Sequence, residues 1–165
     1  MGDSSLTSQR VLIIDSLLSY TRGIDRLDAE AVSAAFHPGA ILHHCGPEPM
    51  VIGDFVEYAL PSLRKRFVAT QHRVSNIRVE IDGDHALVES YVLAFHVEDI
   101  DGEKKLHTFN GRYIDQFERK NDFWRIQKRQ LRNDWSKVES ISEEMSGSAV
   151  WEKSARDSSD PIYTQ

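Results

Sequence analysis

The sequence has a single cysteine, Cys45, among its 165 residues. One cysteine excludes an internal disulfide and a cysteine-based metal site, and it fits a reducing compartment. Free cysteine is among the most buried residue types, so we expect Cys45 to be a small core residue.

Long apolar runs and blocks of like charge are also absent. No apolar stretch approaches the roughly 20 residues that a membrane-spanning helix needs, and residues 1–10 lack the basic start and apolar run of a signal peptide. The formal net charge of -6 comes from acidic and basic residues mixed along the chain, without a basic stripe. We therefore expect a cytoplasmic protein that binds neither nucleic acid nor membranes.

The strong catalytic and metal motifs are missing as well. There is no phosphate-cradling glycine loop, no G-x-S-x-G turn and no helical H-x-x-x-H pair. His43 and His44 are neighbours, but they point to opposite faces of a regular strand and so cannot chelate one ion together. We expect neither a metal ion nor a cofactor.

Helical patterns occupy the first third of the chain. Apolar residues recur at helical spacing within residues 8–22, and Gly23 is the expected stop of this helix. Asp28 is placed as the N-cap of a short second helix, which the sequence His37-Pro38-Gly39 should end. Residues 40–45 form a short strand candidate. A third helix is expected over residues 53–67, and Pro61 must kink it or split it.

The pattern changes after residue 67 to long stretches rich in β-branched and aromatic residues. Turn signals separate four expected strands, so we predict an antiparallel meander. Within residues 72–81 the apolar parity switches, which predicts a β-bulge near Ser75 and Asn76. The fold class is therefore α+β: a cone-shaped α+β barrel in which three N-terminal helices pack on a strongly curved, mainly antiparallel sheet. The expected strands span residues 69–82, 85–99, 105–119 and 123–135.

The last thirty residues differ in composition from the rest. Residues 136–165 contain eight serines and few apolar anchors. We expect one domain over residues 1–135, followed by a loosely held, partly ordered tail with one short helix.

Three segments resemble a known family: "SYTRGIDRLDAEAVSAAF", "ATQHRVSNIRVEIDGDHALVESYVLAFH" and "GRYIDQFERKNDFWRIQKRQLRNDW". They are similar to the SnoaL-like branch of the nuclear transport factor 2-like superfamily, over roughly residues 8–135. This branch includes dehydratases and a dehydrochlorinase. The resemblance implies the cone-shaped fold and proton-transfer chemistry without a cofactor.

The resemblance also implies four site residues. Asp25 matches the family's aspartate after the first helix, and His72 matches the histidine at the start of the first long strand. Arg129 matches an arginine five residues after a tryptophan, here Trp124. Tyr20 stands where the bile-acid dehydratases have a tyrosine and the dehydrochlorinase has a lysine, which disfavours dehydrochlorination. A carboxylate bonded to one ring nitrogen of histidine leaves the other as a general base, while Arg129 and the Tyr20 hydroxyl would stabilise an oxyanion or hold a departing hydroxyl.

The residues themselves leave alternatives open. Asp25 could cap a helix or a turn, and Tyr20 could be an interior aromatic. Arg129 has the opposite strand parity to Trp124 and to the isoleucine at 126, so it would face solvent within a basic cluster unless a bulge intervenes. Arg112 could then supply the cationic group.

The expected function is a cofactor-independent lyase of the dehydratase type, acting on a small hydrophobic cyclic substrate that carries a hydroxyl group. Two alternatives remain: an isomerase or cyclase of steroid-like or polyketide-like compounds, or a non-catalytic small β-subunit of a ring-hydroxylating dioxygenase. Members of the family commonly associate, so we expect a homo-oligomer, with a trimer favoured over a dimer.

Overall fold

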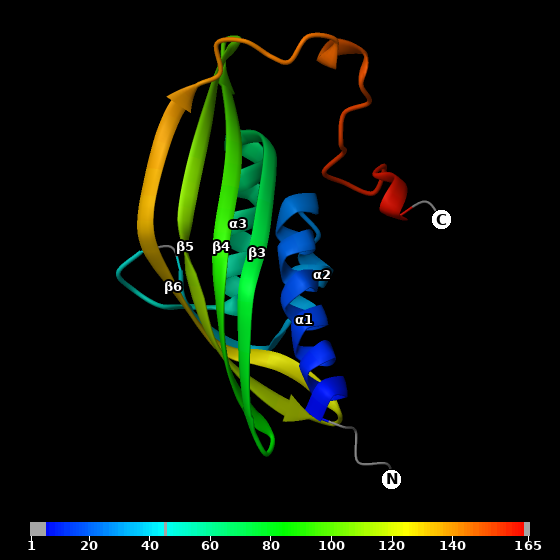
Figure 1. The fold of residues 1–165 in the computed structure, drawn as a ribbon, viewed down its shortest axis with the longest axis vertical. Helices are drawn as coiled ribbons and strands as arrows, with labels where there is room; N and C mark the ends of the chain where they lie inside the picture. Colours follow the sequence, from blue (N-terminus) through cyan, green and yellow to red (C-terminus); the bar gives the residue numbers. More distant parts are fainter. Residues whose placement is uncertain (1–5, 45, 164–165) are drawn as a thin grey trace.

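Three helices pack against one curved sheet in the computed structural model, which describes residues 6–44 and 46–163 (Figure 1). The α+β fold class predicted from the sequence is confirmed. Cys45 lies outside the described residues. The elements are α1 (Leu6–Arg26), α2 (Ala29–Ala34), β1 (Phe36–His43), β2 (Met50–Val51), α3 (Ile52–Arg66), β3 (Phe67–Asp82), β4 (His85–Ile100), β5 (Glu103–Lys120), β6 (Phe123–Ser140) and the short 3₁₀ helices η1 (Ser148–Val150) and η2 (Pro161–Tyr163).

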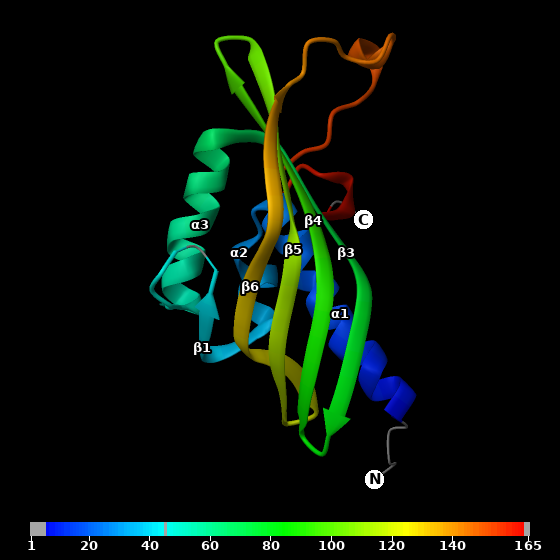
Figure 2. The ribbon, with the colours of Figure 1, turned by 60° about the vertical axis from the view of Figure 1, so that its left-hand side comes forward.

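The sheet has six strands in the order β2-β1-β6-β5-β4-β3 and stays open. The long strands β3 to β6 form the expected antiparallel meander, while β1 joins β6 in parallel and β2 pairs with β1. β3 is therefore an edge strand, and it lies beside α1 (Figure 1, Figure 2). This placement brings the end of α1 next to the start of the meander.

Two of the register shifts in the sheet, one in β3 and one in β6, decide how the side chains near the cavity face. The register of β3 against β4 shifts between Ser75 and Arg78, and Asn76 has a left-handed φ of 50°, so the predicted bulge is confirmed. In β6 the register skips Gln127, because Lys128 pairs with Gln116 and the next pair is Ile126 with Phe117. One extra residue reverses the facing of everything beyond it.

The predicted stop of the first helix at Gly23 is wrong, because α1 continues to Arg26. The helix ends in a Schellman motif around Leu27, whose φ is 56°: the Asp28 amide donates to the Gly23 carbonyl at 2.9 Å and the Leu27 amide to the Ile24 carbonyl at 3.4 Å. Asp25 thus lies in the last turn of α1.

Glycine at position 23 serves the contact between α1 and α2. A Cβ there would lie 2.8 Å from the backbone nitrogen of Val32 and 2.9 Å from its Cγ2. Asp28 caps α2 as predicted, accepting from the Ala31 amide at 2.9 Å. α2 ends at Ala34, ahead of the expected stop.

α3 runs through Pro61 without a break, so the alternative of two helices is wrong. The expected strand at residues 40–45 begins earlier, at Phe36, and therefore includes the segment that was expected to end the second helix.

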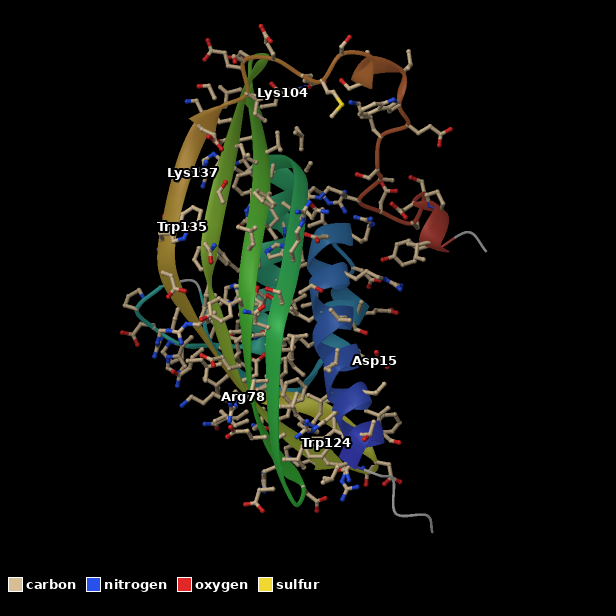
Figure 3. The ribbon with its side chains drawn as sticks, viewed as in Figure 1. Asp15, Arg78, Lys104, Trp124, Trp135 and Lys137 are labelled. Atoms are coloured by element: carbon tan, nitrogen blue, oxygen red, sulfur yellow. The ribbon has the colours of Figure 1, made fainter. Side chains whose placement is uncertain are left out.

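The core lies between the three helices and the inner face of the sheet. Ile13, Leu17, Tyr20 and Ile24 follow one face of α1 and are buried, while Val11, Leu12 and Leu18, which also fit the sequence pattern, are exposed. Trp124 of β6 is buried beside the N-terminal half of α1 (Figure 3). β6 continues to Ser140, beyond the expected domain boundary at residue 135, and residues 141–163 then return toward α1 (Figure 1).

Candidate active site

An apolar cavity of about 400 Å³ opens between the helices and the inner face of the sheet. α1 and α3 supply one wall, and β3, β4, β5 and β6 supply the other. Most of the lining is apolar or aromatic, as in sites that take small ring compounds. The polar residues in the wall include Tyr20, His44, His72, His96 and Tyr113.

Asp25 and His72 are in direct contact at the wall of this cavity. The ring Nδ1 of His72 donates to Oδ1 of Asp25 at 2.8 Å, and the backbone amide of His72 donates to Oδ2 at 2.8 Å. Because β3 is an edge strand, this amide has no strand partner on that side, and the carboxylate takes its place. The side chains of His72 and Asp25 are only 9% and 12% exposed. We call these residues the Asp25–His72 pair.

The lowered pKa of Asp25 shows that its neighbours stabilise the negative charge of the carboxylate. Burial would raise the pKa, but the hydrogen bond and charge of the His72 ring, the His72 amide and the Thr70 hydroxyl together bring it below the usual 3.8. Asp25 is therefore an ionised carboxylate at neutral pH. The His72 nitrogen that remains for chemistry is Nε2.

Arg129 forms a buried layer with two tyrosines. Its guanidinium carbon lies 4.2 Å from the ring centroid of Tyr20 and 4.0 Å from that of Tyr113, so it is sandwiched between both rings. Nε and Nη2 donate to the two oxygens of Asp115, each at 2.7 Å. Both partners of this ion pair are fully buried.

The bulge at Gln127 puts Arg129 on the inner face together with Trp124, which the strand parity alone did not indicate. Arg129 does not line the cavity itself; Tyr20 and Tyr113 do. Arg112 lies on the outer face, where it pairs with Glu89 at 2.8 Å, so it is not the alternative cation of the cavity.

Electrostatics in this layer favour a neutral Tyr113 phenol and a charged guanidinium. Burial, together with Tyr20, raises the pKa of Tyr113 well above 10, and Arg129 opposes the shift. Burial disfavours the charge of Arg129, yet Asp115 and the two phenols outweigh it and raise its pKa. A phenol backed by a fixed cation and by a second phenol can donate a hydrogen bond to an oxygen that gains negative charge.

Two further histidines of the cavity were considered in the sequence only as metal ligands. Burial, with Arg129 and His72 adding to it, lowers the pKa of His44 to about 3. Burial, chiefly reinforced by His72, lowers the pKa of His96 to about 4. Both are neutral at pH 7. No group of three or more His, Cys, Asp or Glu side chains within residues 6–44 and 46–163 is placed to hold a metal ion.

Tyr113 was not among the four site residues expected from the sequence, although a signal for it existed. Tyr113, Asp115 and Phe117 alternate along β5 and are all buried. A carboxylate at a core position implies a buried cation, and Arg129 was the candidate in the adjoining strand.

The fold and cavity define a class of protein: a cone-like α+β scaffold that encloses a small-molecule site. The family comparison is consistent with this class and more specific, because residues 6–130 match the model of the SnoaL-like domain. The chain belongs to the SnoaL-like domain family. No curated protein matches it.

Many solved structures share this fold. A protein from Novosphingobium aromaticivorans that is provisionally named a scytalone dehydratase is 22% identical, with a TM-score of 0.70, covering 88% of this chain and 100% of the other. A type 2 hexachlorocyclohexane dehydrochlorinase is 17% identical, with a TM-score of 0.72 and coverage of 86% and 96%. A second N. aromaticivorans protein, provisionally named an aromatic ring hydroxylase, is 22% identical, with a TM-score of 0.70 and coverage of 84% and 96%. At these identities the comparison establishes the shared fold.

None of the helices in the described part of the chain is long and apolar enough to span a membrane.

Proposed function

We propose that this protein is a cofactor-independent lyase of the dehydratase type, acting on a hydroxylated cyclic small molecule. The observation that carries the proposal is the 2.8 Å hydrogen bond between Nδ1 of His72 and the Asp25 carboxylate, in the wall of an apolar cavity. The carboxylate fixes the tautomer of the ring and favours the imidazolium that forms when Nε2 takes a proton.

In the proposed reaction, Nε2 of His72 removes a proton from a carbon of the substrate, and the electron pair of that C–H bond becomes the new C=C bond. The C–O bond on the neighbouring carbon breaks. The departing hydroxyl takes the phenolic proton of Tyr20 and leaves as water. The imidazolium then returns its proton to the Tyr20 phenolate, so no cofactor is consumed.

Arg129 and Tyr113 take supporting roles in this mechanism. Arg129 lies against the faces of both tyrosine rings and does not line the cavity, so it would stabilise the transient phenolate of Tyr20 from behind. This differs from the direct contact with substrate that the resemblance implied. Tyr113 would share the same charge through its hydrogen bond with Tyr20.

The test is turnover of a panel of hydroxylated alicyclic, steroid-like and polyketide-like compounds, followed by mass spectrometry. We expect the loss of one water per turnover, and we expect His72→Ala to lower the rate by about 10²- to 10⁴-fold, the usual contribution of a general base. His85→Ala, at an exposed position at the start of β4, is the matched control. Full activity of the His72 variant would remove the mechanism.

The isomerase or cyclase alternative uses the same proton-transfer pair. It is distinguished by the product, because isomerisation or cyclisation leaves the mass of the substrate unchanged. The alternative of a dioxygenase β-subunit is disfavoured by the cavity. A non-catalytic subunit has no functional reason to keep a carboxylate-bound histidine in the wall of an apolar cavity. Co-purification with a larger iron-containing protein would favour that subunit role instead.

We also propose that the protein forms a homotrimer through the outer face of the sheet. Large apolar side chains are exposed there, including Tyr91 at 43% and Trp135 at 48%. Trp135 and Lys137 lie on β6, across the sheet from α1 (Figure 3). Gel filtration with light scattering at micromolar concentration should give three times the mass of the chain, and a monomer would reject the proposal.

A further inference from the structure

The C-terminal tail, which we define as residues 141–163, returns to the helix that carries Asp25. It leaves the end of β6 and comes down beside the C-terminal end of α1 (Figure 1). Asp160 pairs with Arg26 at 3.2 Å, and the hydroxyl of Tyr163 donates to the Asp28 carboxylate at 3.0 Å. Both contacts are made within three residues of Asp25.

One residue of the tail, Arg156, contacts the backbone of Asp25 and residues near the start of β3. Nη1 of Arg156 donates to the Phe67 carbonyl at 2.6 Å, Nη2 to the Thr70 hydroxyl at 3.2 Å, and Nε to the Asp25 carbonyl at 3.4 Å. A single guanidinium therefore ties the start of β3 to the last turn of α1. The relative position of these two elements sets the distance between the carboxylate and the imidazole.

Thr70 links Arg156 to the carboxylate of Asp25. The Thr70 hydroxyl donates to Asp25, and Thr70 is buried on β3 two residues before His72, hence on the same face. Arg156 does not line the cavity, so any effect on a bound substrate passes through the residues that it contacts, Asp25 among them. The site of Arg156 is unfavourable for a cation, because burial lowers its pKa, as do the charges of Arg64 and Arg26, although Asp25 partly offsets them.

We propose that Arg156 is a positioning residue of the Asp25–His72 pair, which fixes the Asp25 carboxylate through the Asp25 carbonyl and the Thr70 hydroxyl. The catalytic importance of this role rests on the proposed function, but the positioning itself does not. The full active site then includes a segment that lies beyond the family match at residues 6–130.

The experiment is solution NMR on the ¹⁵N-labelled full chain, and it needs no substrate. In Arg156→Ala we expect the ring Nδ1–H signal of His72 to shift and broaden, and the His72 backbone amide to exchange with solvent about tenfold faster, as for the loss of one hydrogen bond to a charged group. The Val92 amide in the central strand β4 is the reference for global opening, and its exchange should not change.

The matched control is Tyr163→Phe, which removes a tail contact at Asp28 but leaves all three Arg156 contacts in place. Wild-type His72 signals in this variant support the proposal. If Arg156→Ala leaves His72 unchanged, or if both variants alter His72 equally, Arg156 only helps to dock the tail and the proposal is overturned. A protein that turns over no substrate yet shows the Arg156 effect would defeat the proposed function and leave the positioning role intact.

Discussion

The Arg129–Asp115 pair combines charge, stacking and complete burial at one position. Burying two ions costs several kcal/mol each, and the cost is recovered only with close geometry and further hydrogen bonds. Here two parallel 2.7 Å bonds and two aromatic faces provide that geometry. The pair holds Tyr20 and Tyr113 at the inner end of the cavity.

Asp115→Asn should therefore be strongly destabilising. The amide keeps the shape but loses the charge, so Arg129 becomes an uncompensated buried cation. Breaking a buried pair in this way typically costs about 3–5 kcal/mol in the free energy of unfolding, measurable by urea denaturation.

An exposed ion pair on the same sheet provides the control for Asp115→Asn. Arg78 and Glu80 are paired at 2.8 Å on β3, with side chains 74% and 55% exposed. Glu80→Gln should cost less than about 1 kcal/mol, as surface pairs do. If the two substitutions cost the same, burial does not govern the strength of the Arg129–Asp115 pair.

At the scale of elements, the close packing of α1 against α2 fixes the last turn of α1, which carries Asp25. Gly23 allows this packing because it has no side chain. Gly23→Ala would push a methyl group against the Val32 backbone, which cannot move aside as a flexible side chain can. We expect a loss of about 1–3 kcal/mol in the free energy of unfolding, the usual cost of overpacking.

The control for Gly23→Ala is Gly53→Ala in the first turn of α3, where an added Cβ meets nothing within 4 Å. This change should be neutral or stabilise by up to about 1 kcal/mol, since alanine is the better helix former. Equal effects at the two positions in thermal unfolding would contradict the close approach at Gly23.

The two bulges show what strand parity can and cannot predict. The bulge in β3 was predictable because the apolar side chains on either side of Ser75 fit opposite faces. The bulge at Gln127 was not, because the residue that it turns inward, Arg129, is charged and looks like a solvent-facing residue. Its buried partner Asp115 could be recognised only once β5 and β6 were paired.

The end of the first helix was misjudged for a related reason. Gly23 fits the rule for a helix stop, but its missing side chain serves the packing of α1 against α2, and Leu27 adopts the left-handed conformation instead.

At the scale of the whole molecule, the strand order followed from turn signals and β-branched runs, which are local and strong. The placement of Asp25 and His72 followed from the family resemblance. The docking of the tail could not be predicted, because Arg156 binds backbone carbonyls, and these contacts leave no periodic pattern in the sequence. The placement of His44, just after β1, and of His96, on β4, in the cavity wall likewise depends on the tertiary fold.

These two histidines predict how the stability of the whole protein depends on pH. Their pKa values fall from the ordinary 6.5 to about 3 for His44 and about 4 for His96. The unfolded chain therefore binds these protons first as the pH falls. Stability that is fully present above about pH 6.5 is lost as the pH falls, down to about pH 4 for His96 and about pH 3 for His44, by up to about 1.4 kcal/mol per pH unit for each histidine. Asp25 acts in a lower range: its lowered pKa makes a contribution that is present above 3.8 and lost only as the pH falls further.

Urea denaturation at several pH values between 7 and 4.5 measures this slope. His44→Gln and His96→Gln should each reduce it, since each removes a group that the unfolded chain protonates before the folded chain does. The exposed His85 is the control, and His85→Gln should leave the slope as it is. A free energy of unfolding that stays constant from pH 7 to 5 would mean that the cavity is open enough to hydrate both imidazolium ions, and an apolar site for a ring compound would then lose its physical basis.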